Sequence, residues 1–310
     1  MGSSGRHFLA PGRPTQRARG HLAPKVFLRK ALDFQARKVT SRFRLPYGKR
    51  IYARRWLAEP KLDVNRMSFP VNHGRLRGRG FRIIQLSDIH VGNYVGDEQL
   101  CWLAHRLRAL EPDLLFMTGD FVNRSYREAI PAQKGFHALA SIAPTYGVLG
   151  NHDFWHGPEE LAHLLTKAGI RMLRNEHVVI DVNDNPLVLA GVDDWKTEHD
   201  DLGKAVQGMP TDRKYVKILL SHCPDLLHPA SEHGFDLVLA GHTHGAQVKV
   251  PIVSSAVNKF MHGEFERGWM RSKNTALYIN RGLGVVLIPL RLHSDAEVTV
   301  LELVPGTPPA

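Results

Sequence analysis

The sequence predicts an α/β fold in which a sheet is layered with helices. Six short apolar runs, each ending in polar residues, recur from residue 81 onward: Phe81–Asp88, Asp113–Asp120, Thr145–Asn151, Pro186–Asp193, Val216–His222 and Phe235–His242. Helix-like segments such as Glu98–Leu110 and Pro158–Ala168 separate the early runs, and Ala276–Leu303 predicts further strands around a turn at Gly282–Gly284. Strands that alternate with helical patterns are typical of sheets covered by helices.

Length and composition exclude several classes of protein. The chain has 310 residues, of which 43% are hydrophobic, so it can bury a large core and is not disordered throughout. No apolar run approaches the ~18 to 20 residues that a membrane-spanning helix needs. Two cysteines, Cys101 and Cys223, exclude a disulfide scaffold and favour a reducing compartment.

The net charge of +11 is unevenly distributed along the chain. Residues 1–80 carry 20 basic and three acidic side chains, a net charge of +17, and residues 81–310 carry a net charge of −6. The part with the apolar runs therefore offers no evident basic groove, and nucleic acid is not its expected partner.

The N-terminal quarter divides into two predicted segments. Residues 1–24 read as a disordered basic tail, because Gly, Ser, Pro and Arg dominate without periodicity. Within residues 25–55, Leu28, Leu32, Gln35, Val39 and Phe43 recur at helical spacing among arginines and lysines. A basic amphipathic helix of this kind lies on an anionic membrane surface or packs on the domain with its basic face in solvent. The sequence leaves both interpretations open.

Five polar motifs follow the predicted strands: Asp88-Ile89-His90, Gly119-Asp120, Gly150-Asn151-His152-Asp153, Ser221-His222 and Gly241-His242-Thr243-His244. Each is a weak signal alone, since a lone Asp at a strand end is usually a cap or turn residue. Together they predict a metal site, because ligands gather beyond the carboxyl ends of strands and alternate residues of an extended segment share a face. Mixed His, Asp and Asn ligands suit Mn²⁺, Fe or Zn²⁺ better than Ca²⁺ or Mg²⁺.

This series of motifs, in this order, resembles the calcineurin-like metallophosphoesterase superfamily over Phe81 to Leu303. The resemblance implies a four-layer αββα sandwich with mixed sheets over residues 56–310, preceded by the basic N-terminal extension. It also implies two divalent ions, with Mn²⁺ expected first. The implied ligands are Asp88, His90 and His244 for the first ion, Asn151, His222 and His242 for the second, and Asp120 as the bridge.

The resemblance further implies hydrolysis through attack of a metal-bridged hydroxide on phosphorus. His152 is then the catalytic residue that faces the phosphoryl group, and Asp153 orients it or, as the favoured interpretation, has a structural role. Arg281, Trp155 and His156 are the candidate substrate contacts. A surface role for Arg281 and a packing role for Trp155 are the alternatives.

A narrower similarity is carried by Asn280-Arg281-Gly282-Leu283-Gly284, by residues 191–194 and by residues 222–225. It links the chain to a bacterial subgroup of membrane-associated phosphodiesterases and a UDP-2,3-diacylglucosamine pyrophosphatase of lipid A synthesis. The expected function is therefore hydrolysis of a phosphodiester or diphosphate in a lipid-linked substrate, at the cytoplasmic face of the bacterial inner membrane. Hydrolysis of soluble nucleotides or nucleic acid is the alternative. A non-catalytic scaffold is disfavoured because every motif is present, and the sequence gives no oligomeric state.

Overall fold

The computed structural model describes residues 50, 52, 61–72, 74–247, 265–286 and 289–306, all within the unit Arg44–Ala310. The predicted tail over residues 1–24 lies outside the described residues. The predicted helical segment over residues 25–55 also lies outside them, apart from Arg50 and Tyr52. In the described part, no helix combines the length and apolar character needed to cross a membrane.

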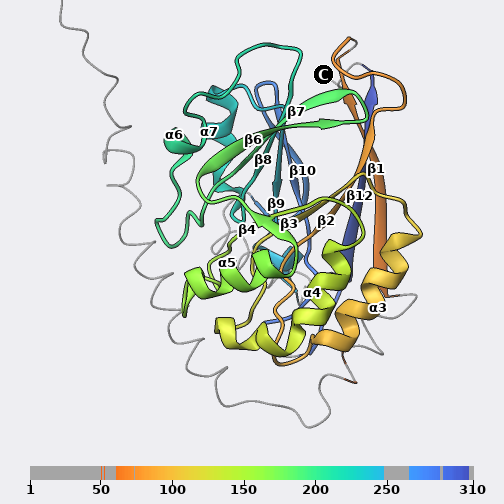
Figure 1. The fold of residues 1–310 in the computed structure, drawn as a ribbon, viewed down its shortest axis with the longest axis vertical. Coiled ribbons are helices and arrows are strands. Elements are labelled where there is room, and N and C mark those ends of the chain that lie inside the picture. The colour runs from red at the N-terminus through yellow and green to blue at the C-terminus, as the bar shows by residue number, and fades with distance from the viewer. Residues whose placement is uncertain are drawn as a thin grey trace, which may run out of the picture. The chain divides into compact units, whose positions relative to one another are not determined.

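Two six-stranded mixed sheets form the centre of this unit (Figure 1). In spatial order, the strands of the first sheet are β1 (Leu62–Val71), β12 (Ala296–Pro305), β2 (Phe81–Leu86), β3 (Leu114–Thr118), β4 (Thr145–Val148) and β5 (Ile170–Met172). Strand β12 pairs antiparallel with β2, and every other neighbouring pair in this sheet is parallel. Strands β2, β3 and β4 therefore end at one edge.

The second sheet has a parallel centre between two antiparallel outer pairs. In spatial order its strands are β10 (Gly268–Ser272), β11 (Thr275–Ile279), β9 (Leu237–Ala240), β8 (Val216–Leu220), β7 (Asn185–Gly191) and β6 (Glu176–Val182). The pairs β10/β11 and β6/β7 are antiparallel, whereas β11, β9, β8 and β7 run parallel. The carboxyl ends of β7, β8 and β9 consequently share one edge.

Helices cover the outer faces of both sheets, which confirms the expected four-layer arrangement. On the first sheet lie α3 (Asp97–Arg108), α4 (Gln133–Ala140) and α5 (Pro158–Lys167), and on the second lie α6 (Leu202–Ala205) and α7 (Leu227–Glu232). Short 3₁₀ turns occur at Tyr126–Glu128, Ile130–Ala132, Pro224–Leu226 and His244–Ala246.

The core has three layers, and this explains why the strands are apolar on both faces. In β3, Leu114 and Phe116 belong to the cluster between the sheets, while Leu115 and Met117 belong to the cluster under the helices. A strand buried on both sides reads as a continuous apolar run rather than an alternating one. All six predicted runs contain strands, and both predicted helices form.

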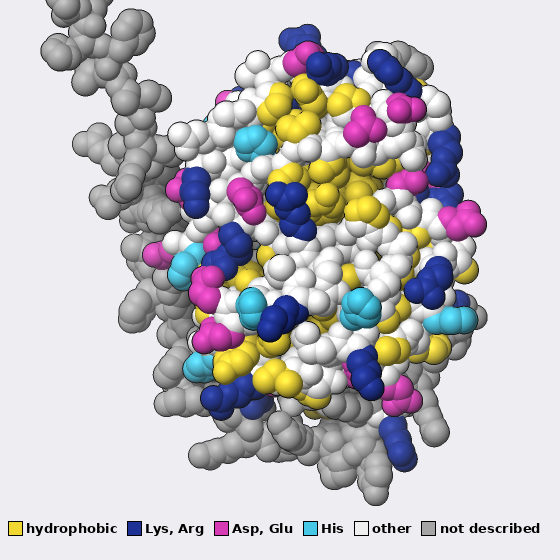
Figure 2. Space-filling model, in the orientation of Figure 1, with side chains coloured by type: hydrophobic (Ala, Val, Ile, Leu, Met, Phe, Trp, Pro, Cys, Tyr) yellow, Lys and Arg dark blue, Asp and Glu magenta, His cyan; other side chains and the backbone are white. Residues whose placement is uncertain are grey.

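The less apolar or shorter elements were not predicted from the sequence. They are β1, β5, β6, β10, α4, α6 and α7. Strand β1 carries the polar residues Asp63, Asn65 and Arg66 because it lies at the edge of its sheet, where only three of its ten residues are buried. On the face drawn in Figure 2, basic and acidic side chains are interspersed.

Candidate metal centre

The predicted ligands lie at the carboxyl ends of strands from both sheets. Asp88, Asp120 and Asn151 follow β2, β3 and β4 of the first sheet, and His222 and His242 follow β8 and β9 of the second. Within each sheet these strands are parallel, so the side chains that follow them meet at one edge. The face-to-face packing of the sheets then brings the two sets together.

The backbone at these ligands is strained. Asp88, His90, Asp120, His242 and His244 all have φ between 48° and 73°, a region that non-glycine residues seldom occupy. Each such conformation costs on the order of 1–3 kcal/mol, and it persists where the surrounding structure imposes it. Strain repeated at five polar residues of one site is typical of a functional centre.

Two glycines make the close approach of the loops possible. A Cβ atom at Gly150 would overlap Oδ1 of Asp120, and a Cβ atom at Gly241 would overlap Oγ of Ser87 and Oδ2 of Asp88. Each glycine therefore allows one ligand loop to pack directly against the carboxylate of another.

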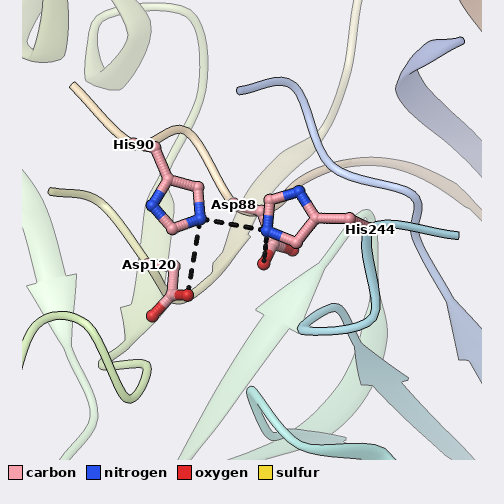
Figure 3. Close-up of side chains that lie close together, drawn as sticks. All are labelled: Asp88, His90, Asp120 and His244. Carbon is pink, nitrogen blue, oxygen red and sulfur yellow. Dashed lines mark hydrogen bonds and ion pairs between the residues drawn. The ribbon is translucent and has the colours of Figure 1, made fainter. Parts of the chain in front are cut away.

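One group of predicted ligands, four residues from three loops, converges on one point (Figure 3). The Nε2 atoms of His90 and His244 lie 3.1 Å apart, Nε2 of His90 lies 3.5 Å from Oδ2 of Asp120, and Nε2 of His244 lies 3.3 Å from Oδ1 of Asp88. One ligand atom from each of the four residues lies within 4.8 Å of all the others, and all four side chains are buried.

A second group forms around His222. Its Nε2 atom lies 3.3 Å from Oδ2 of Asp120, 3.2 Å from Oδ1 of Asn151 and 3.2 Å from Nδ1 of His242. Its Nδ1 atom is hydrogen-bonded to the carbonyl oxygen of Thr118 at 2.8 Å, which fixes the ring. The structure thus assembles all seven predicted ligands, with Asp120 in contact with both groups.

The electrostatics of the two groups suit divalent cations. Burial lowers the pKa of His90 to about 3 and lowers that of His244 well below its usual value, so both rings are neutral and keep a lone pair for a metal. Burial opposes the charge of Asp120, but the neighbouring His222 and His152 hold its pKa well below its usual value. Burial opposes the charge of His222, but Asp120 and the other nearby carboxylates raise its pKa to about 10, so this ring must give up a proton to a divalent cation. The buried carboxylates together with the neutral His90 and His244 form a donor set that a divalent cation would stabilise.

His152 is positioned beside this centre by two hydrogen bonds. Its backbone N–H donates to Oδ1 of Asp120 at 2.9 Å, and its ring Nδ1 bonds to the carbonyl oxygen of Asn123 at 2.7 Å. The Nε2 atom consequently faces the ligands, 4.0 Å from Oδ2 of Asp120. The carboxylate of Asp153 accepts hydrogen bonds from the backbone N–H groups of Val122 and Gly150, at 3.1 and 2.9 Å. These bonds support a structural role for Asp153 in holding the loops.

The three candidate substrate contacts differ in their surroundings. The ring of Trp155 packs on His152 with 3.7 Å between centroids, whereas the side chain of His156 is exposed. The guanidinium of Arg281 is paired with two carboxylates, Glu297 at 2.7 Å and Asp63. Arg281, just after β11, is therefore held by ion pairs to β12 and β1.

Sequence reasoning missed Lys196, whose Nζ atom lies 3.5 Å from Nε2 of His242. This residue lies in the loop after β7, and β7 ends at the same edge as β8 and β9. The position of the loop was the available signal, because residues that follow any parallel strand of this sheet reach the same edge.

Comparisons with known proteins agree with this arrangement. Residues 81–246 match the family model described as calcineurin-like phosphoesterase. The chain is 30% identical to the metallophosphoesterase YkoQ of Bacillus subtilis over 78% of this chain and 90% of that protein. It is 29% identical to the metallophosphoesterase YkuE of the same organism, over 72% of this chain and 79% of that protein. It is 30% identical to the phosphodiesterase YaeI of Escherichia coli, over 72% of this chain and 82% of that protein.

The matched region begins at β2 and ends just after His244, so it contains all seven predicted ligands and His152. The motifs, the two mixed sheets and the buried ligand cluster point to the same chemistry. The chain therefore belongs to the calcineurin-like phosphoesterase family and is a metal-dependent phosphoester hydrolase.

Proposed function

We propose that the protein is a phosphodiesterase with a centre of two divalent ions. The observation that carries this proposal is the position of Asp120, whose Oδ2 atom lies 3.5 Å from Nε2 of His90 and 3.3 Å from Nε2 of His222. A carboxylate between two ligand groups is suited to bridge two ions, and two-metal sites hold their ions ~3.5–4 Å apart.

The proposed ligand sets follow the two groups of contacts. Asp88, His90 and His244 hold the first ion, and Asn151, His222 and His242 hold the second. When bound, two divalent ions activate the attacking water and stabilise the charge on the phosphoryl oxygens. Mn²⁺ is the expected ion, with Fe and Zn²⁺ as alternatives, because the donors are imidazole nitrogens and carboxylate oxygens.

His152 acts on the leaving group in this proposal. Its Nδ1–H group donates to the carbonyl oxygen of Asn123, which orients the opposite nitrogen, Nε2, toward the centre. In the doubly protonated ring, the proton at Nε2 passes to the leaving oxygen as the ester P–O bond breaks, and the ring is left neutral with its remaining proton on Nδ1. Trp155 packs on the ring and restricts its rotation.

A phosphodiester is the proposed bond because a relative of 30% identity carries the name phosphodiesterase. We extend the proposal to a lipid-linked phosphodiester or diphosphate, such as UDP-2,3-diacylglucosamine, met at an anionic membrane surface on the cytoplasmic side. The resemblance of residues 280–284 to a membrane-associated subgroup and the basic character of residues 25–55 support this extension.

The test is hydrolysis by the purified full chain before and after treatment with a chelator. With Mn²⁺ restored, bis-p-nitrophenyl phosphate should be hydrolysed, and the Asp120→Asn variant should lose at least about 10²-fold in kcat, since it weakens the bridge between the ligand groups. The Asp181→Asn variant, at an exposed position of β6, is the matched control. Activity in Asp120→Asn equal to that of the control would refute the shared centre.

A panel then assigns the substrate. UDP-2,3-diacylglucosamine, cyclic nucleotides and single-stranded DNA are compared at equal metal loading. Turnover of the lipid-linked diphosphate with the highest kcat/KM would support the proposed substrate class. A higher kcat/KM for cyclic nucleotides or DNA would replace it with a soluble substrate.

A further inference from the structure

A basic cavity lies at the end of the second sheet opposite to the metal centre. It has a volume of about 580 Å³, and residues from β1, β8, the β10–β11 turn and the chain before β9 line it. Lys217 of β8 is among them, and His222 follows the other end of the same strand. Five residues of extended chain span about 17 Å, so the cavity is separate from the metal ligands.

Lys217 is the most unusual residue of this cavity. Its exposed fraction is only 8%, although lysine is rarely buried without a partner. Among the described residues, no hydrogen bond or ion pair forms with its ammonium group. The Nζ atom itself is not among the described buried atoms that lack a partner, so the ammonium reaches the space of the cavity, where a negatively charged ligand can contact it.

The carboxylate of the cavity does not serve that purpose. Both oxygens of Asp236 bind the guanidinium of Arg75, at 2.6 and 2.7 Å, and Oδ2 also accepts the backbone N–H of Lys217 at 2.8 Å. The charge of Asp236 is thus already balanced by Arg75. Asp236 therefore does not form an ion pair with the ammonium of Lys217.

Two further cations line the cavity. Arg213 and Arg271 are both exposed, and within the part of the chain that the structure describes neither guanidinium forms an ion pair. Together with Lys217 they leave three positive charges uncompensated, in a region of the chain whose overall charge is negative. Guanidinium groups bind phosphate with paired hydrogen bonds, and an ammonium adds a point charge.

The size and walls of the cavity indicate the class of ligand. A volume of about 580 Å³ falls within the range of small-molecule and cofactor sites, about 300–1,000 Å³. Phe69 and Phe235 contribute apolar surface beside the cations. We propose that this cavity is a second, non-catalytic site, which binds a soluble compound with two or more phosphate groups, of about the size of a nucleoside diphosphate.

Binding to this site is measured on the full chain in the Asp120→Asn background with a chelator present, so that the metal centre does not contribute. Sodium pyrophosphate and ADP are the probes in calorimetric titrations. Both should bind, and increasing NaCl should weaken the binding because three charges are involved. Absence of binding by both compounds would overturn the proposal.

The decisive comparison removes the cations. A double variant, Lys217→Met with Arg271→Gln, should weaken binding by at least about tenfold, the effect expected from losing charge-assisted hydrogen bonds. The matched control, Lys167→Met with Arg171→Gln, removes the same charge from exposed positions of α5 and β5 and should bind as before. Equal affinities in the two variants would overturn the proposal.

Stability separates a binding role from a structural one. Lys217→Met keeps the length of the side chain and removes a charge that pairs with no described residue, so the melting temperature without ligand should stay about constant. The stabilisation by pyrophosphate should disappear in the same variant. A lowered melting temperature without ligand would assign Lys217 to folding instead.

A third arm excludes a lipid surface as the source of the phosphate. Vesicles of phosphatidylcholine mixed with phosphatidylglycerol are compared with the soluble probes. The cavity variant and its control should bind vesicles equally. Loss of vesicle binding in the cavity variant, without any binding of pyrophosphate or ADP, would overturn the soluble class of ligand.

Discussion

The backbone N–H of His152 donates a hydrogen bond to Oδ1 of Asp120 at 2.9 Å. The same carboxylate presents Oδ2 to His90 and His222, so one side chain contacts both ligand groups and also fixes the loop of the proposed proton donor. Any displacement of Asp120 therefore moves the ligands and His152 together. Substitutions at His152 and at residues packed on Asp120 should therefore change activity in ways that can be measured separately.

The role of His152 predicts a dependence on the leaving group. The His152→Gln variant should lose about 10²–10⁴-fold in kcat with a diester that releases an alkyl alcohol, because that leaving oxygen needs a proton. The loss should be smaller with bis-p-nitrophenyl phosphate, whose leaving group departs as a stable anion. Steady-state kinetics with both substrates measure the difference.

His163→Gln is the matched control, since His163 is exposed on α5. It should retain full activity with both substrates. Equal losses with both leaving groups in His152→Gln would show that His152 stabilises charge on the phosphoryl oxygens without transferring a proton.

The packing of Gly150 predicts a steric effect on the centre. In Gly150→Ala, the new Cβ atom overlaps Oδ1 and the backbone N of Asp120. The bridge must shift, so activity should fall, and the free energy of unfolding should decrease by about 1–3 kcal/mol. Thermal denaturation and Mn²⁺-dependent hydrolysis measure the two effects.

Gly203→Ala is the control for this substitution. Its Cβ atom would lie 3.4 Å from Oδ1 of Asp201, in ordinary van der Waals contact, within the short helix α6. Alanine is favoured over glycine in helices by about 1 kcal/mol, so the control should keep or gain stability. Unchanged stability and activity in Gly150→Ala would contradict the close packing of the loops.

The network around Glu297 predicts a stability change that depends on pH. Burial alone would raise the pKa of Glu297, but the paired Arg281 and hydrogen bonds from Tyr278 and Thr299 lower it below its usual value. The resulting stability is fully present above the unfolded-state pKa, about 4.3, and is lost as the pH falls through the lower folded-state pKa. Glu297→Gln should therefore cost on the order of 2 kcal/mol at neutral pH.

Denaturation curves at several pH values measure this effect. The difference between the native chain and Glu297→Gln should be constant from neutral pH to about pH 5 and should shrink below about pH 4. Glu302→Gln, on the same strand but with a half-exposed pair to Arg82, should cost less than about 1 kcal/mol. A gap that widens on acidification would contradict the lowered pKa of Glu297.

The basic segment over residues 25–55 predicts attachment to anionic membranes. Replacing Arg37, Lys38 and Arg42 by Gln should weaken binding to phosphatidylglycerol vesicles by about 1 kcal/mol for each residue. Vesicle flotation at low and high salt measures it, and binding should fall as salt rises.

The control replaces three exposed basic residues of the described domain, Lys167, Arg171 and Lys204, by Gln. It should float with the vesicles as the native chain does. If both triple variants behave alike and salt has no effect, the segment packs on the domain with its basic face in solvent.

The sequence predicted the elements that are buried on both faces. Such strands are continuous apolar runs, because neighbouring residues such as Leu115 and Phe116 are buried on opposite faces of the sheet. The edge strand β1 was not predicted, because four of its ten residues are polar and its place depends on pairing with β12, more than 200 residues later. Short helices such as α6 have too few residues for a helical period.

Local sequence by itself identified the candidate ligand residues of the site, because the metal motifs combine strand ends, glycines and donor side chains within a few positions. Only the tertiary structure decided which of these donors meet. The contact between His90 and His244 joins residues 154 positions apart, and it exists because two sheets pack with their carboxyl edges together. The approach of Lys196 to His242, the pairing of Arg281 with Glu297, and the position of Lys217 at the cavity depend on the same packing. No local sequence pattern predicts these contacts, because they join residues that are distant in the sequence and meet only when the strands pack.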